Sequence, residues 1–473
     1  MPNELAKLML YAWAPLSIFL FSRYPAPLAA SISIVGASAL LPSGFALDLP
    51  PLPPLDRDAI AGLASLMGCA IFGLRYLQAR LPGTGLELLA VLMVLGALGT
   101  AIANQDAVAI GGRNFGGLRL YDGVVAAIAV VLGILVPFYV GRAVFRRAAD
   151  LKVLLVVFAV GGLAYSVLVL WEVRMSPHIH DSLYGYQPAL FRMSRRGVLW
   201  GWRPMVFVGH GISLTMLVLS CTMAAGALWR ARTRFLGFTG KVATPYLFGV
   251  LFACQSLGSL AYATFALPVL AWLRPRAQSM VLTAIALIVL TYPVSRAADV
   301  FPTDTLVDVA GRVSEDRAAS LQFRFTNEDI LIDHALERPL FGWGGFGRNR
   351  VYTEAGRRAV VTDGYWIILF GISGAVGFVC AFGILAIPTL RAARAVRRRP
   401  VSRDTFLVLG AAWITALCAT DLLPNGFLSG RTFFVAGALT GALEGWRSLR
   451  PSRTEKPKPL TALTPIVPTA RRA

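Results

Sequence analysis

Arginine is concentrated in a long hydrophilic stretch towards the C-terminal end of the chain, over residues 296–363. About as many acids accompany its nine arginines, which are Arg296, Arg312, Arg317, Arg324, Arg338, Arg348, Arg350, Arg357 and Arg358. A guanidinium group stays charged and binds phosphate oxygens bidentately. Fixed cations also stabilise negative charge that develops during a reaction. A hydrophilic connection of this length inside a membrane protein is more often functional than idle.

A second hydrophilic stretch, residues 172–204, is also rich in arginine. It contains only two acids, Glu172 and Asp181, but five arginines: Arg174, Arg192, Arg195, Arg196 and Arg203. Arg195, Arg196 and Arg203 lie nearest to the apolar run that follows, and they are the best candidates for substrate binding. The alternatives are that these arginines pair with acids of 296–363 or with lipid headgroups. His210 lies just inside that apolar run, where it is either a packed, hydrogen-bonded histidine or a functional one.

A helix-to-loop transition stands within the first stretch. Residues 329–336 have helical spacing, and the chain then enters a loop with four glycines in six positions, 342–347. Glycine lets a backbone amide approach a ligand closely. The loop is therefore either a binding loop or a plain helix stop followed by a flexible turn.

Three other features are weaker candidates for chemistry. His178 and His180 could bind a metal, but no carboxylate cluster accompanies them. The Asp56-Arg57-Asp58 run resembles a metal-binding Asp-x-Asp, although Asp before a helix is more often an N-cap. Asp122 is expected to cap the helix that starts near 120.

Composition places the chain in a membrane. It has 473 residues, of which 56% are hydrophobic and only 15% charged, against roughly 25% charged in soluble domains. The net charge of +20 is carried by connections between apolar blocks, which favours the positive-inside rule over nucleic-acid binding. The five cysteines (Cys69, Cys221, Cys254, Cys380 and Cys418) all fall in apolar blocks, where free cysteine is a small core residue.

The sequence predicts an all-α integral membrane protein with 12–13 transmembrane helices. Apolar blocks lie at 8–22, 26–41, 59–77, 86–103, 120–141, 153–171, 205–229, 245–272, 278–295, 364–388, 405–423 and 430–446. Most are about as long as a helix that spans a bilayer, whereas 8–22 and 26–41 are short. The most basic connections lie at 142–152, 230–241, 274–276 and 391–403, and we expect them to face the cytoplasm.

One block conflicts with that orientation unless it is divided. The block 245–272 is long, and both of its flanks are basic. Two short helices that rise and return, turning at Gln255-Ser256-Leu257-Gly258-Ser259, would keep both flanks in the cytoplasm. A polar break at membrane depth is tolerated beside protein or a water-filled cavity.

This topology divides the chain into four parts. They are a multi-span region (1–295), a large periplasmic loop (296–363), C-terminal membrane helices (364–446) and a basic, disordered cytoplasmic tail (447–473). Segments 104–119 and 172–204 are also expected on the periplasmic side, as is the turn at 424–429. Whether blocks 8–22 and 26–41 cross twice or form a hairpin stays open.

Two runs in the late part of the chain resemble a known family. The run RPLFGWGGFG (338–347) is followed by TDGYWIILFGISG (362–374). These runs resemble the bacterial O-antigen ligase and O-antigen polymerase superfamily. The resemblance extends over roughly 245–385. The resemblance implies a GT-C-like, metal-independent glycosyltransferase without cofactors in the bacterial inner membrane. Its substrates would be an undecaprenyl-diphosphate-linked glycan and a glycan or lipid acceptor, met at the periplasmic face.

The resemblance also implies roles for particular residues. The family's upstream arginine maps to Arg324, with Arg317 as its neighbour. Arg324 would grip the diphosphate with Arg195, Arg196 or Arg203, and Asp363 would orient the acceptor. Trp343, Gly344 and the rest of the glycine loop would shape the sugar pocket. His210 is included among the substrate-binding candidates.

The chain departs from the ligase pattern at two places. The Ser-Arg element of ligases maps to Ser256-Leu257-Gly258-Ser259, which lacks the arginine, and the ligases' His-Asn reads Thr362-Asp363. Ligation and polymerisation therefore both stay open. The rival functions are a polytopic transporter or lipid-linked glycan flippase, and a non-catalytic relative that scaffolds a polysaccharide machine. Transporters usually show internal repeats, and we see none in this chain.

Overall fold

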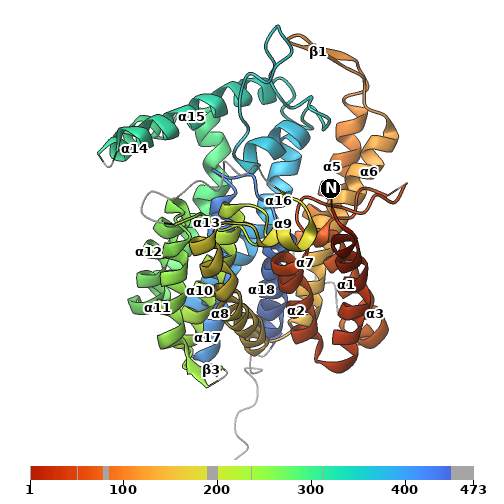
Figure 1. Cartoon of the computed structure of the whole chain (residues 1–473). Helices are drawn as coiled ribbons and strands as arrows, with labels where there is room; N and C mark the ends of the chain where they lie inside the picture. The colour runs from red at the N-terminus through yellow and green to blue at the C-terminus, as the bar shows by residue number, and fades with distance from the viewer. Residues whose placement is uncertain are drawn as a thin grey trace, which may run out of the picture.

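The chain forms a helical bundle beneath a smaller layer of loops and helices (Figure 1). This computed structural model describes residues 2–50, 52–77, 85–188, 201–235, 237–312 and 314–448. Only two short antiparallel hairpins interrupt the helices in these ranges. They are β1 (Val108–Ile110) with β2 (Arg113–Phe115), and β3 (Arg234–Phe235) with β4 (Phe238–Thr239).

Seven helical segments are long and apolar enough to cross a membrane, counted over the described ranges. They are α1 (Glu4–Arg23), α6 to α7 (Leu120–Val144), α8 with its preceding turn (Ala148–Met175), α10 (Gly211–Arg230), α13 (Pro275–Ala297), α16 (Tyr365–Arg397) and α17 (Arg403–Asp421). The joined segment consists of α6 (Leu120–Val130), a π-helical turn (Val131–Leu135) and α7 (Val136–Val144). The segment Ala148–Met175 consists of a 3-10 turn (Ala148–Asp150) followed by α8 (Leu151–Met175). The predicted multi-pass helical membrane class is confirmed.

Shorter helices complete the bundle. The apolar ones are α2 (Ala26–Leu40), α5 (Leu86–Ile102), α11 (Gly240–Ala253) and α12 (Leu257–Trp272). The others are α3 (Arg57–Phe72), α4 (Leu74–Leu77), α9 (Ile179–Tyr184), α14 (Thr303–Gly311), α15 (Glu315–Leu336) and α18 (Gly430–Ser448). Helices α10 and α17 are the most enclosed of the long helices, because their residues are buried on nearly every side. All five cysteines are buried and free, as predicted.

The predicted division of block 245–272 is confirmed. Helix α11 ends at Ala253 and α12 begins at Leu257, so the break is Cys254-Gln255-Ser256. It is shorter than predicted, because Leu257, Gly258 and Ser259 already belong to α12. The two helices rise and return, since the start of α11 and the end of α12 line one pocket with the end of α10.

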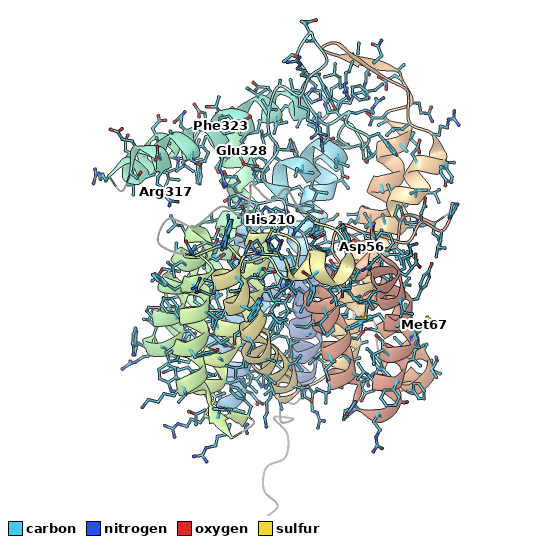
Figure 2. All side chains as sticks on the ribbon, in the orientation of Figure 1. Asp56, Met67, His210, Arg317, Phe323 and Glu328 are labelled. Atoms are coloured by element: carbon cyan, nitrogen blue, oxygen red, sulfur yellow. The ribbon has the colours of Figure 1, made fainter. Side chains whose placement is uncertain are left out.

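Helix α15 is held across the top of the bundle by a buried carboxylate. Glu328 accepts hydrogen bonds from Arg296 Nε (3.0 Å), Tyr292 Oη (3.0 Å) and Trp366 Nε1 (2.6 Å). Burial raises the pKa of Glu328, and the bond from Arg296 opposes that rise. Because the three donors come from α13 and α16, they fix both the height and the rotation of α15 on the bundle (Figure 2).

The glycine-rich loop docks into a break in α16. At Gly374 the backbone has φ +62°, and a Cβ there would stand 2.3 Å from the Leu340 carbonyl oxygen. The amides of Trp343 and Gly344 donate to the carbonyls of Gly371 (2.8 Å) and Ile372 (2.9 Å). The two sequence runs that carry the family resemblance are therefore hydrogen-bonded to each other.

Candidate functional site

Arg324 lies about one helical turn before the Glu328 anchor on α15, so both side chains lie on the same face of that helix. Its Nε stands 3.6 Å from the Asp363 Oδ2, just ahead of α16. Both side chains keep about 40% of their surface exposed, at 40% and 41%. Asp363 is not a helix cap, because Gly364 occupies the N-cap position of α16. The structure thus pairs the two residues predicted to be catalytic.

Arg203 approaches the same place from the loop that leads into α10. Its side chain lies against the backbone of Gly211, and it interacts electrostatically with Arg324. Burial lowers the pKa of the Arg203 guanidinium, and Arg324 acts in the same direction. The Nε group is buried and has no hydrogen-bond partner in the described part of the chain. A buried, unpaired donor of this kind is suited to an anionic ligand.

His210 is the N-cap of α10 and stays neutral. Its Nδ1 accepts the Ile212 N–H at 3.2 Å, and its ring stacks on Phe427 with 4.0 Å between centroids. Burial lowers the pKa of His210 to about 4, and the charge of Arg203 contributes. With Nδ1 as acceptor, the neutral ring carries its proton on Nε2 and can only donate there. Figure 2 shows His210 beneath α15.

The turn between α17 and α18 supplies two charged residues that the sequence reasoning missed. Asp421 ends α17, accepts from Asn425 Nδ2 at 2.8 Å and lies within electrostatic reach of Arg324. Arg431, in the first turn of α18, is only 5% exposed and also lies within reach of Asp421. Its Nη2 donates to the Ser213 carbonyl at 3.3 Å, whereas its Nε and Nη1 have no partner among the described residues. The sequence did contain a signal for Asp421 and Arg431, because both are ionisable residues at the ends of apolar helices.

The first turn of α3 closes the inner side of this group. Arg57 donates to the carbonyls of Phe207 (3.1 Å) and Val208 (3.3 Å), and so holds the backbone that leads to His210. Asp58 packs against Gly430 and interacts electrostatically with Arg431. Asp56 caps α3 by accepting from the Ala59 amide at 2.9 Å, as the simpler interpretation predicted.

We refer to the group formed by Arg203, His210, Arg324, Asp363, Asp421 and Arg431 as the outer cluster. Its members come from four separate segments: the loop before α10, helix α15, the loop before α16, and the α17–α18 turn with its flanks. Backbone contact joins the last two, since Tyr365 N donates to the Asn425 carbonyl at 3.1 Å. The cluster offers unpaired guanidinium donors, one neutral imidazole donor and two carboxylates.

Two predicted site residues lie in a different cluster. Trp343 stacks on His334 at 4.5 Å and donates from Nε1 to the His334 carbonyl at 2.7 Å, while Gly344 packs against Leu118. Arg338 lies over the Trp343 ring at 4.4 Å.

Two arginines hold this second cluster to the loop that follows α5. Arg338 forms an ion pair of 2.5 Å with Asp106, and this hydrogen bonding lowers the pKa of Asp106. Arg348 is 1% exposed and donates to the carbonyls of Trp343, Asp106 and Gly116. These contacts tie the glycine-rich loop to the loop after α5 and to Gly116, directly after β2. Its role in a sugar pocket stays a prediction.

The remaining predicted residues are dispersed. Arg317 lies two turns before Arg324 on α15, further out along that helix (Figure 2). Arg195 and Arg196 lie outside the described residues. So does most of the predicted C-terminal tail.

Two of the weaker candidates have structural roles. His180 uses both ring nitrogens on backbone groups, with Nδ1 at 2.8 Å from the Tyr186 carbonyl and Nε2 accepting from Ser43 N at 3.3 Å. Asp122 accepts from the Arg119 amide at 2.7 Å and closes the start of α6, as predicted.

Comparison with known proteins does not assign the chain to a family. No protein-family model matches it, and no curated protein matches it significantly.

Proposed function

We propose that the chain is a membrane glycosyltransferase of the O-antigen ligase and polymerase type. It would transfer or polymerise a glycan carried on undecaprenyl diphosphate. The observation that carries the proposal is a set of buried guanidinium donors without partners in the described chain, namely Nε of the partly buried Arg203 and Nε and Nη1 of the buried Arg431. Arg203 interacts with Arg324 of the Arg324–Asp363 pair, and Arg431 is connected to Arg324 through Asp421, which lies within electrostatic reach of both. A lipid diphosphate matches this arrangement, because its charge sits where its lipid tail enters the bilayer.

The chemistry follows from these positions. Arg203, Arg324 and Arg431 would bind the two phosphates, with the Nε2–H of His210 as a further donor. The acceptor hydroxyl oxygen forms a bond to the anomeric carbon while the bond from that carbon to the diphosphate breaks. Undecaprenyl diphosphate leaves with the bonding electron pair, and the cations stabilise its developing charge.

A carboxylate would take the acceptor's proton. Asp363 is the better placed candidate, since it is half exposed and held by Arg324. Asp421 is buried and bonded to Asn425, so it is better suited to holding the arginines in place. No metal or cofactor takes part in this scheme.

The outer cluster would face the periplasm of a bacterial inner membrane. The basic connections at 142–152, 230–241, 274–276 and 391–403 would then face the cytoplasm, as the positive-inside rule requires. The C-terminus would be cytoplasmic. The seven long helices with α2, α3, α5, α11, α12 and α18 would provide the 12–13 crossings.

A complementation experiment tests the proposal. The gene is deleted in its host and restored as wild type, Arg324→Ala or Arg203→Ala, and surface and lipid-linked glycans are analysed. Loss of an arginine that binds the leaving group should lower output roughly 100-fold or more. The matched control is Arg358→Ala, which removes one exposed arginine from the same face outside the cluster.

The products separate the possible reactions. Single repeat units with lost chain length would mean polymerisation, and full-length glycan accumulating on the lipid carrier would mean ligation. Unchanged glycan in the deletion strain would exclude the proposed glycosyltransferase function and favour a transport function. Normal output from both arginine variants would show that the outer cluster is not the transfer site.

A further inference from the structure

A basic pocket is lined by residues of the β3–β4 hairpin and its neighbours. Figure 1 shows this hairpin at the end of the bundle opposite α15. Its volume is about 800 Å³, within the range of ligand sites. Five cations line it and no carboxylate does: Arg230, Arg232, Arg234, Lys241 and Arg403. Helices α11 and α17 both begin there, at Gly240 and Arg403, and add the positive ends of their dipoles. The pocket is therefore suited to an anion.

Packing divides these five cations into two kinds. Arg230 donates to the carbonyls of Ala271 (2.7 Å) and Leu273 (3.3 Å) and lies over the Phe406 ring. Arg403 donates to the Thr233 hydroxyl at 3.0 Å. Arg230 and Arg403 are therefore engaged by the protein itself and form part of the pocket wall.

The other three cations are free to meet a ligand. Arg232, Arg234 and Lys241 are exposed, and no ion pair engages them in the described chain. The short hairpin places Arg234 opposite Thr239, directly before the start of α11.

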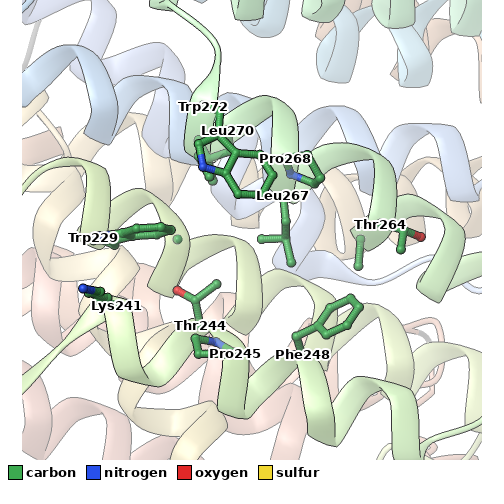
Figure 3. A pocket seen from close by; sticks show the side chains of 13 residues that line it. Trp229, Lys241, Thr244, Pro245, Phe248, Thr264, Leu267, Pro268, Leu270 and Trp272 are labelled. Atoms are coloured by element: carbon green, nitrogen blue, oxygen red, sulfur yellow. The ribbon is translucent and has the colours of Figure 1, made fainter.

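An apolar groove opens from the same place. Its volume is about 410 Å³, and it runs between α10, α11 and α12, lined by residues such as Phe248, Leu267 and Pro268 (Figure 3). The groove and the basic pocket share four residues: Trp229, Lys241, Ala271 and Trp272. Trp272 is 74% exposed, and exposed tryptophans of membrane proteins gather at the headgroup level.

We propose that the groove and the pocket together bind one anionic phospholipid. Its phosphate group would lie among Arg232, Arg234 and Lys241, and an acyl chain would lie along α11 and α12. A free anion would use the pocket but not the groove. A zwitterionic lipid also carries a phosphate, but its own ammonium group compensates that charge, so a lipid with net negative charge matches the pocket and the groove best. The inference depends on the membrane class of the protein and not on its proposed reaction.

The test uses full-length protein that has been stripped of lipid in a neutral detergent. Native mass spectrometry then measures binding of phosphatidylglycerol and of phosphatidylcholine. The wild type should prefer phosphatidylglycerol. The variant R232Q/R234Q/K241Q should bind phosphatidylglycerol at least roughly tenfold more weakly, because each cation near a lipid surface contributes appreciably.

Two further variants make the test specific. R394Q/R397Q/R398Q removes the same charge from exposed arginines outside the pocket, and it should leave binding unchanged. Thr264→Trp fills the groove without touching the cations, and it should weaken phosphatidylglycerol binding.

Three outcomes would overturn the proposal. Equal loss in both charge variants would indicate general surface attraction. Equal binding of phosphatidylcholine would indicate an apolar groove alone. Competition by inorganic phosphate together with unchanged binding in Thr264→Trp would indicate a site for a soluble anion.

Discussion

Arg324 and Asp363 stand 39 positions apart in the chain, yet their side chains meet with 3.6 Å between Nε and Oδ2. The contact joins helix α15 to the loop before α16, and Arg324 also interacts electrostatically with Arg203 of the outer cluster. Such a half-exposed ion pair contributes only about 0–1 kcal/mol to folding. Its position therefore matters more for ligand binding than for stability.

The first prediction concerns this pair. Arg324→Ala and Asp363→Ala should each lower thermal stability little, because solvent already screens the interaction. Each should still abolish glycan output in the deletion strain. Melting curves of purified protein, recorded beside the glycan analysis, check both parts. A large fall in melting temperature, accompanied by lost output, would assign the pair a structural role instead.

The second prediction concerns pH. The pKa of His210 is about 4 in the folded protein and about 6.5 in an unfolded chain. The unfolded state therefore binds the proton first as pH falls, so stability decreases between pH 6.5 and pH 4, by as much as about 3 kcal/mol. His210→Asn keeps an N-cap for α10 and should reduce that decrease. Melting temperatures across this pH range test it; identical slopes in both proteins would refute it.

The third prediction concerns the break in α16. Gly374→Ala places a Cβ 2.3 Å from the Leu340 carbonyl oxygen at φ +62°, so the docked loop must move. We expect destabilisation of at least about 1–3 kcal/mol. Gly161→Ala in α8 is the control, because nothing lies within 4 Å of its Cβ. Thermal unfolding of the two variants should differ clearly, and equal melting temperatures would contradict the docking role of Gly374.

The fourth prediction concerns Arg431. Removing both members of a pair of buried, interacting charges is often neutral or stabilising, because no uncompensated charge is left behind. Arg431→Met together with Asp421→Asn should therefore keep or raise the melting temperature while glycan output is lost. Binding of undecaprenyl diphosphate to the purified double variant should fall as well. Retained binding and output would remove Arg431 from the proposed site.

Much of the fold could be predicted because a bilayer imposes one simple demand on the chain. Apolar blocks must form helices to pair their own backbone groups, and the basic flanks of 245–272 required the turn now seen at Cys254-Gln255-Ser256. Local chemistry was equally readable at Asp56 and Asp122, because a cap acts on the amides next to it.

The site was only partly predictable. Charge placement and family resemblance pointed to Arg203, Arg324 and Asp363, but the sequence gives no distance between segments so far apart. The contribution of Asp421 and Arg431 depends on how the α17–α18 turn meets α15 and α10, which is a matter of packing. Likewise, composition could not tell whether the amides of Trp343 and Gly344 face a ligand or α16.

The sequence by itself determined the membrane class, the positions of most helices and the types of residue available for chemistry, because these depend on local composition and on the solvent around each segment. Tertiary structure alone decided which charges share a site. Long-range electrostatics and hydrogen bonding follow distance in space, and the buried Glu328 anchor sets that distance for Arg324.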